Sequence, residues 1–460
     1  MRLFFLLSLS ILSVVSVAQD TTRLSLLFAG DIMGHDSQIA AAYNAKTGRY
    51  DYAPCFQFVK PYISMVDLAI GNLELTLAGP PYKGYPQFSS PDVLASTLKD
   101  IGFDALVTAN NHSVDRGKKG IVRTIHILDS LNIPHTGTFV DEADRLNNYP
   151  LILRKNGFTL ALLNYTYGTN GIPVPSPTIV NPIDTAMIRA DIKKAKEQEP
   201  DAIIVFTHWG TEYENLPRKG ERNTAEFCFA QGADLVIGSH PHVLQPMEWR
   251  KEDNKLVVYS LGNFVSGQRK RYTDGGAMAY VELKKVRDES GTITTTIDSA
   301  GYLLNWVYRT VDDDKDYYVM PVPSFEKETR FIKDVTSKTA MKEFISDSRL
   351  LYGKHNINVG EIKTTPPDSI VTYKVLLSVP EFKPGAASAI DSSLVTMIDP
   401  FYGLEILIQD NVEPTFIIGP FTDPLKADAI CQQFIRNGRQ ALTVKYVNDE
   451  AKLETEEVIR

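Results

Sequence analysis

Short apolar runs alternate with helical segments along the first two thirds of the chain. Seven such runs lie between Leu24 and Leu283, at 24–29, 66–70, 105–108, 159–163, 202–206, 235–237 and 256–259. Between them, segments 121–131 and 187–196 have apolar residues at helical spacing, and Ser90-Pro91 is typical of a helix start. This alternation predicts an α/β fold, and taken alone it favours a doubly wound sheet.

Six of the seven runs end in polar residues that could carry chemistry. They lead into Asp31 and His35; Asn72 and Glu74; Asn110, Asn111, His112 and Asp115; His208, Trp209 and Glu212; His240 and His242; and Ser260 and Asn263. In open α/β sheets, ligands bind beyond the carboxyl ends of the strands, so we expect these segments to converge on one cleft. Any single segment could be a turn or a helix cap, but six together favour a functional site.

The residue types in these segments favour a metal centre. The segment GSHPHVLQ at 238–245 carries two histidines around Pro241, and neutral imidazole is the commonest metal ligand in proteins. An isolated His-x-His could equally be a surface feature, but here carboxylates, Asn and further histidines accompany it. Two metal ions about 3.5–4 Å apart need a bridging carboxylate and several neutral ligands, which this set supplies. Neither a GxSxG motif nor a GxxxxGK[ST] motif is present.

The N-terminal segment predicts export. Residues 1–18 combine Arg2, an apolar block from Leu3 to Val17 and the ending Ser16-Val17-Ala18, which is typical of a signal peptide cleaved before Gln19. An uncleaved N-terminal anchor is the alternative. We therefore expect the protein in the periplasm or cell envelope.

The net charge limits the possible partners, and the cysteine content limits the possible disulfide and metal sites. The formal net charge of −8 argues against a nucleic-acid partner, which would need a basic face. Cys55, Cys228 and Cys431 are scattered, so they form neither a disulfide framework nor a CxxC metal site.

Six segments, in order, resemble the motif set of the CapA family, the poly-gamma-glutamate capsule biosynthesis proteins. They are FAGDIMGHD, GNLE, TANNHSVDRG, THWGTEY, GSHPHVLQ and SLGNF. The resemblance covers residues 24–325 and implies the fold of the calcineurin-like metallophosphatases, a metal-bearing β-sandwich flanked by helices. On this basis we expect a CapA-like metallophosphatase domain at 22–325 in place of a doubly wound sheet.

The resemblance also implies two divalent transition metal ions, Mn, Zn or Fe, held by acidic, amide and imidazole side chains. The expected ligands are Asp31, His35 and His242 for one ion, Asn111, His208 and His240 for the other, and Glu74 as the bridge. Two features depart from the phosphatase pattern. The usual Asp-x-His is here Asp31-x-x-x-His35, and Glu74 stands where an Asp is usual.

Further residues would act on the substrate, which we expect to be a phosphoester or an anionic polymer. By the same resemblance, His112 would be the general acid, and Asn72, Trp209 and Asn263 would line the cleft. Candidate cations for an anionic substrate, which could equally be solvated loop charges, are Lys83, Arg116, Lys118 and Arg269 to Arg271.

The pattern changes in the last third of the chain. The Lys- and Glu-rich segment 326–369 predicts a helical linker, and beyond it strands are expected at 373–379, 404–408, 416–419 and 442–447, with a helix at 424–436. The segment FIIGPFTDPLKADAICQQFIRNGRQALTV resembles a SPOR domain, a βαββαβ module that binds peptidoglycan, so we expect such a domain at 370–460. A structural cap on the large domain is the alternative.

The combined expectation is an exported, metal-dependent hydrolase of the metallophosphoesterase type that acts in capsule or envelope polymer biosynthesis. Peptidoglycan would bind the C-terminal module, and membrane-bound capsule synthesis proteins would be further partners. The alternative is a noncatalytic envelope or polymer-binding protein that keeps the metal site.

Overall fold

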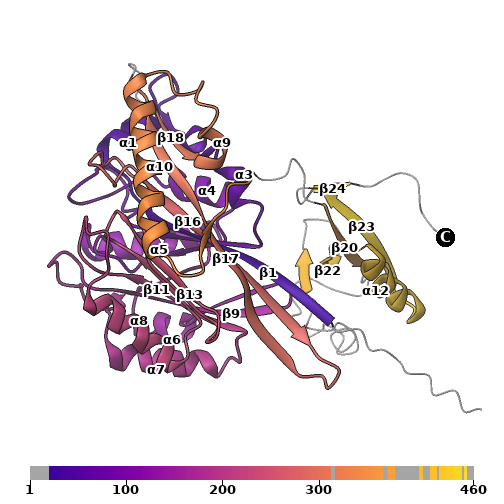
Figure 1. Ribbon diagram of the computed structural model, residues 1–460. Helices are drawn as coiled ribbons and strands as arrows, with labels where there is room; N and C mark the ends of the chain where they lie inside the picture. The colour runs from indigo at the N-terminus through magenta and orange to yellow at the C-terminus, as the bar shows by residue number, and fades with distance from the viewer. Residues whose placement is uncertain are drawn as a thin grey trace, which may run out of the picture.

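A computed structural model describes residues 20–311, 316–365, 371–378, 404–407, 415–421, 424–447 and 450–452 (Figure 1). The expected signal peptide, residues 1–18, and its cleavage point before Gln19 lie outside these residues. The helices are α1 Asp36–Ala42, α2 Ala53–Phe56, α3 Lys60–Ile63, α4 Val93–Asp100, α5 Gly117–Ser130, α6 Glu142–Asn148, α7 Thr185–Lys196, α8 Lys219–Gln231, α9 Val322–Phe325, α10 Val335–His355 and α12 Pro424–Arg436. No helix in the described part of the chain is both long and apolar enough to cross a membrane.

The first sheet of the large domain has nine strands. Its main path runs in the order β18-β17-β16-β1-β4-β5-β6, while β15 pairs with β1 and β19 with β17. The strands are β1 Asp20–Ile32, β4 Leu68–Leu73, β5 Ala105–Val107, β6 His135–Thr136, β15 Asn263–Val265, β16 Gly275–Arg287, β17 Ile293–Arg309, β18 Tyr317–Pro321 and β19 Gly360–Glu361. Strands β1, β4, β5 and β6 are parallel, and β16, β17 and β18 extend the sheet in antiparallel fashion.

The second sheet has six strands in the order β13-β14-β12-β11-β9-β8. They are β8 Leu151–Lys155, β9 Phe158–Thr166, β11 Ala202–His208, β12 Leu235–Ser239, β13 Leu244–Arg250 and β14 Lys255–Leu261. Two short ribbons complete the domain and join β2 Tyr43–Asn44 to β3 Arg49–Tyr50, and β7 Thr138–Phe139 to β10 Ile179–Val180. Strands β9, β11, β12 and β14 are parallel.

The two sheets pack face to face around one apolar core. Alternate residues of β1 show the arrangement, because Leu26 and Phe28 join Ile204 and Ile237 of the second sheet in the core between the sheets. Leu27 faces the opposite way, into a second core with the helices α2 to α4. Both faces of the central strands are therefore buried, which explains their continuous apolar runs.

Helices α7 and α8 cover the outer face of the second sheet (Figure 1). The expected β-sandwich flanked by helices is therefore confirmed, and the doubly wound sheet favoured by strand and helix alternation alone is not what forms. The difference arises because β16, which follows the second sheet in the chain, pairs with β1 of the first sheet, and β17 lies next to β16.

The parallel strands of both sheets end at the same edge of the sandwich. Within the first sheet, the register places Asp31 of β1 beside Asn72 of β4 and Asn263 of β15. Within the second, His208 of β11 lies beside Ser239 of β12. The chain therefore brings the polar ends of six runs to one place.

Segment 326–369, which we expected to be a linker, is largely part of the large domain. Its helix α10 buries Met341, Phe344 and Tyr352 in the core between the sheets, and β19 pairs with β17. The Lys and Glu residues of α10 occupy its outer side, so the composition resembled that of a linker although one face is apolar.

The described C-terminal residues form a separate five-stranded antiparallel sheet in the order β21-β22-β20-β23-β24. Its strands are β20 Val371–Ser378, β21 Leu404–Leu407, β22 Thr415–Phe421, β23 Gln440–Val447 and β24 Glu450–Lys452. Helix α12 packs Ala427, Cys431 and Phe434 against Val375 and Phe416 of this sheet. The first helix of the expected βαββαβ order would fall in 379–403, outside the described residues.

Candidate metal centre

Seven expected ligands come from strand ends or from the first residues after them. Asp31 lies in β1 and Glu74 directly after β4, while Asn111 follows β5 and His208 ends β11. His240 and His242 follow β12. All six side chains are almost completely buried, whereas the seventh, His35 before α1, is partly exposed.

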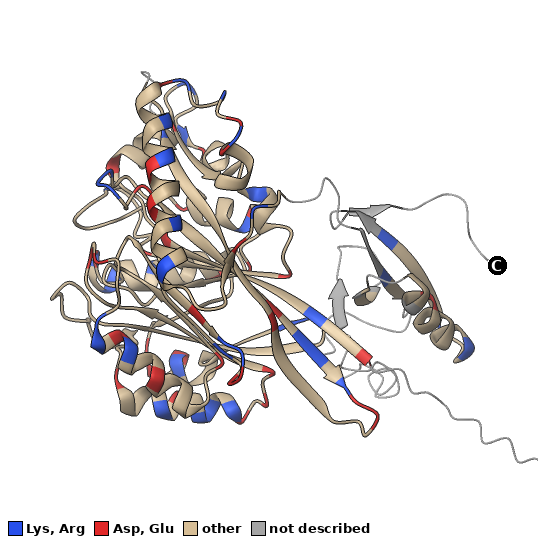
Figure 2. Ribbon diagram, viewed as in Figure 1, with Lys and Arg blue, Asp and Glu red and all other residues tan. Residues whose placement is uncertain are grey.

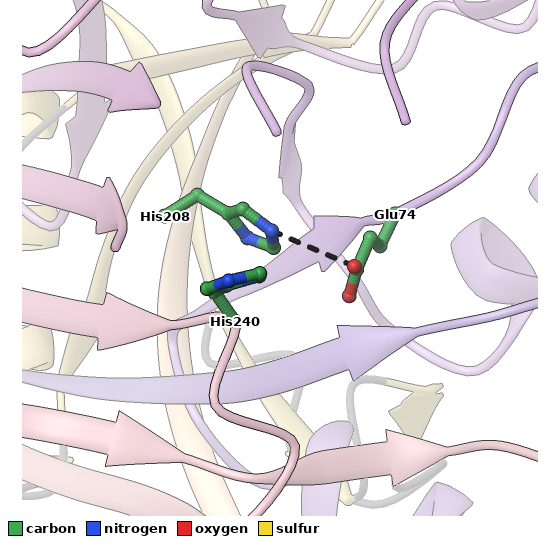
Figure 3. Close-up of side chains that lie close together, drawn as sticks. All are labelled: Glu74, His208 and His240. Atoms are coloured by element: carbon green, nitrogen blue, oxygen red, sulfur yellow. Dashed lines mark ion pairs between the residues drawn. The ribbon is translucent and has the colours of Figure 1, made fainter. Parts of the chain in front are cut away.

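Acidic and imidazole side chains gather in two groups that share Glu74. One group is Glu74, His208 and His240, and the other is Asp31, Glu74 and His242. Within each group, the candidate ligand atoms lie within 4.8 Å of one another. Glu74 Oε1 is 3.5 Å from His208 Nε2 and 3.9 Å from His242 Nε2. Figure 3 shows Glu74 facing the two imidazoles of its first group. This arrangement suits a carboxylate that bridges two cations.

The Glu74 carboxyl is the least satisfied group of the site. It is fully buried, and neither oxygen has a hydrogen-bond partner among the described residues. Burial raises the pKa of Glu74 well above its ordinary value, and the nearby Asp31 carboxylate raises it further. A buried carboxylate without a partner is unfavourable, and a bound cation would remove this penalty. The residues present therefore fit a metal ion.

The imidazoles of the first group are neutral and can therefore act as metal ligands. Burial and, after it, the neighbouring histidines lower the pKa of His208 well below its ordinary value and that of His240 to about 3. His240 Nδ1 is buried and has no hydrogen-bond partner in the described part of the chain. Because neutral imidazole binds metals, both side chains are in the required protonation state at neutral pH.

Asn111 lies where a further ligand is expected. Its Oδ1 is 2.9 Å from His208 Nε2, the same nitrogen that faces Glu74. An amide oxygen, an imidazole nitrogen and a carboxylate oxygen therefore point at one position, and each of them can bind a divalent transition metal.

His35 is placed differently from the other expected ligands. Its Nδ1 accepts a hydrogen bond from the Gly267 amide at 3.1 Å and lies 3.2 Å from Gln38 Oε1. Burial lowers the pKa of His35 to about 4. Among the described residues, His35 belongs to neither of the two groups that share Glu74.

Two of the three residues expected to line a cleft instead support the ligands. Asn72 Nδ2 donates to Asp31 Oδ1 at 2.8 Å and lies 3.2 Å from His208 Nδ1. Asn263 Oδ1 is 3.1 Å from His242 Nδ1, and its Nδ2 donates to the Thr273 carbonyl. Contacts of this kind, made by residues that do not themselves bind the ion, fix the orientation and tautomer of metal-binding imidazoles.

Trp209, the third, is turned toward the helices. Its indole N–H donates to the Tyr259 carbonyl at 2.8 Å, and its ring packs in the core that α7 and α8 form with the second sheet.

The loop that carries His240 and His242 has an uncommon backbone conformation. His240 has φ 101° and His242 φ 58°, values in the left-handed region that favours glycine. His240 N also donates to Asp31 Oδ2 at 3.3 Å, which ties this loop to the first sheet. Backbone conformations of this kind cluster at functional sites, where the surrounding structure holds them in place.

His112 forms a buried pair with Asp115. His112 Nδ1 is 2.7 Å from Asp115 Oδ2, and the same oxygen accepts the Phe88 amide at 2.7 Å. Because a carboxylate only accepts, Nδ1 carries the proton, which leaves Nε2 for proton transfer. His112 is adjacent to Asn111, and its charge lowers the pKa of both His208 and His240. The sequence prediction missed this role of Asp115, although its position three residues after His112 could have indicated it.

The protein is therefore an α/β protein with two layered sheets, and the acidic and imidazole side chains at one edge of these sheets could bind metal. The family described as "Bacterial capsule synthesis protein PGA_cap" matches residues 25–268, which include every candidate ligand. The chain belongs to this bacterial capsule synthesis family, as the six motifs predicted.

Relatives and solved structures show how far the similarity extends. The PGA biosynthesis protein CapA of Bacillus subtilis (strain 168) is 32% identical over 272 residues, 57% of this chain and 68% of the relative. The capsule biosynthesis protein CapA of Bacillus anthracis is 29% identical over 279 residues, 58% of this chain and 65% of the relative, so the chain spans about two thirds of either protein. Among solved structures, a 5'-nucleotidase from Candida albicans SC5314 has a TM-score of 0.35 and 12% identity, over 71% of this chain and 58% of that one. A hypothetical protein from Thermus thermophilus has a TM-score of 0.33 and 16% identity, over 60% of this chain and 98% of that one.

Proposed function

We propose that the protein is a two-metal phosphoesterase that acts on a precursor or polymer of the capsule or cell envelope. One observation carries this proposal, which is that Glu74 is fully buried, has no hydrogen-bond partner among the described residues and is shared by two groups of ligand atoms. Two divalent ions at such a centre supply an acidified water as nucleophile and neutralise charge on a phosphoryl group.

The residues of this chain would hold the two ions and transfer one proton to the leaving group. Asp31 and His242 would hold the first ion, His208, His240 and Asn111 the second, and Glu74 both. His112 Nε2 would donate a proton to the leaving-group oxygen, while Asp115 fixes its tautomer through the 2.7 Å contact at Nδ1. The neutral imidazoles of the first group cannot take over this acid role, because burial keeps them deprotonated.

The proposed cellular role is supported by family membership and by the residues of segments 1–18 and 370–460. Family membership supports capsule biosynthesis, and the printed names of the Bacillus relatives support a polymer of the poly-gamma-glutamate type. We further propose that residues 1–18 direct export to the periplasm or cell envelope, and that residues 370–460 bind peptidoglycan as a SPOR-like module. Membrane-bound capsule synthesis proteins would then be within reach as partners.

The experiment that tests the activity uses the full chain, stripped with a chelator and reloaded with Mn²⁺, Zn²⁺ or Fe²⁺. Hydrolysis of p-nitrophenyl phosphate, bis(p-nitrophenyl) phosphate and glycerol phosphate is measured for wild type, Glu74→Gln and the exposed control Glu252→Gln. We expect turnover by wild type and the control and none by Glu74→Gln. Stable metal binding without turnover of any ester would favour a noncatalytic envelope or polymer-binding protein.

A further inference from the structure

Three exposed tyrosines surround the candidate metal centre. The exposed fraction is 66% for Tyr85, 48% for Tyr167 and 40% for Tyr213, although large aromatic side chains are usually buried. The Tyr167 ring centroid lies 4.5 Å from that of His240, and the Tyr213 centroid lies 6.2 Å from that of His242. The rings thus mark the side on which solvent reaches the site.

Tyr85 belongs to the same opening through a chain of ring contacts. Its ring is 6.5 Å from Phe88, whose ring is 4.6 Å from His112. Burial, the adjacent Glu212 carboxylate and Tyr85 together raise the pKa of Tyr213 to about 12. The ring contacts connect Tyr85 to His112 through Phe88, and Tyr213 to His242, so both tyrosines lie at the edge of the same centre.

Charged side chains of both signs lie at this opening. The exposed Glu212 carboxylate has no ion pair among the described residues, and Lys270 Nζ lies 4.5 Å from the ring centroid of Tyr213. Two other expected cations are already paired, Lys83 with Asp36 at 2.7 Å and Arg271 with Asp347 at 2.9 Å. Figure 2 shows Lys and Arg mixed with Asp and Glu along the coloured helices, without one basic stripe there.

We infer that the phosphoryl group of the substrate is attached to a carbohydrate ring, which packs against Tyr85 and Tyr213 and donates hydroxyl hydrogen bonds to Glu212. This inference rests on the proposed phosphoesterase function and names its substrate class. The negative face of an aromatic ring attracts the polarised C–H groups of a sugar, tyrosine offers a hydroxyl at its edge, and a carboxylate accepts from two hydroxyls. An alkyl chain would instead need a continuous apolar surface, which Glu212 and Lys270 interrupt.

The test uses phosphonates, which the proposed chemistry does not cleave, so that binding is measured apart from turnover. Isothermal titration of the Mn²⁺-loaded full chain compares glucosylmethylphosphonate, methylphosphonate and benzylphosphonate. We expect glucosylmethylphosphonate to bind about tenfold more tightly than methylphosphonate, as two ring contacts of ordinary strength would give, and more tightly than benzylphosphonate, which has no hydroxyl groups to donate to Glu212. The double variant Tyr85→Ala/Tyr213→Ala should lose this gain and keep its affinity for methylphosphonate within about twofold. Tyr43→Ala, which removes an exposed ring that packs on Tyr50, is the matched control and should keep the gain.

Each outcome separates the inference from the proposed function. Equal affinity of the wild type for glucosylmethylphosphonate and methylphosphonate overturns the carbohydrate class, and so does an equal gain for benzylphosphonate, which would indicate a planar aromatic group. If the glucosyl gain depends on Tyr85 and Tyr213 but no phosphoester is turned over, the carbohydrate site stands and the hydrolase function fails.

Discussion

Replacing either member of the pair formed by His112 and Asp115 tests the proposed acid step. His112→Gln removes the imidazole from a position where it is buried beside His208 of the first group. Asp115→Asn keeps an oxygen that can accept from Nδ1 and from the Phe88 amide, but it removes the negative charge. Neither residue belongs to the groups that share Glu74, so both variants should retain metal.

The expected magnitudes follow from the contacts. A positioned general acid contributes about 10²- to 10⁴-fold, so His112→Gln should lower kcat on an alkyl phosphoester by that factor. The charge-assisted hydrogen bond from Nδ1 to Asp115 is worth about 1.5–3 kcal/mol, so Asp115→Asn should cost about 10- to 100-fold. An aryl ester, whose leaving group needs little protonation, should lose less than about tenfold in either variant.

The assay compares kcat for glycerol phosphate and p-nitrophenyl phosphate in wild type and both variants, with metal content measured on the same samples. Equal losses on the two esters would refute the acid role. Loss of metal from His112→Gln would instead identify His112 as a ligand.

Three further predictions concern the metal, the acid stability and the C-terminal module. Glu74→Ala should lose both ions by elemental analysis while Glu252→Gln keeps them, and normal metal content in Glu74→Ala would remove Glu74 from the bridging role. Burial lowers the pKa of His35 to about 4, so the folded, metal-free protein binds fewer protons than the unfolded chain between pH 6.5 and 4, and its stability decreases as the pH falls through this range. At pH 4.5 this loss should be about 2.5 kcal/mol, and His35→Gln should show that much less loss in urea unfolding between pH 7.5 and 4.5; an unchanged difference would contradict the burial argument. Deleting 370–460 should abolish sedimentation with peptidoglycan and spare metal content, whereas aggregation of the truncated protein would indicate a structural cap.

The sequence predicted the convergence of the ligands because local pattern and topology agree. Each apolar run fixes a strand, and each strand delivers its polar end to the same edge of the sandwich. It could not predict which way each side chain turns. Trp209 turns toward the helices because its indole N–H donates a hydrogen bond to the Tyr259 carbonyl. His35 Nδ1 accepts a hydrogen bond from the Gly267 amide, which lies far from it in the sequence.

The fold was predictable only in part for a similar reason. Strand and helix alternation is the same in a doubly wound sheet and in a sandwich, and the two differ in which strands pair. The return of β16 to β1 and the packing of Phe344 and Tyr352 of α10 on the core depend on contacts between distant segments. Only the motif resemblance carried that information.

Anomalous X-ray scattering from crystals of the Mn²⁺-loaded protein tests the central claim most directly. The proposed centre predicts two peaks about 3.5–4 Å apart, one beside Asp31 and His242, the other beside His208 and His240, and both next to Glu74. A single peak, or peaks away from Glu74, would contradict a two-ion centre bridged by this carboxylate.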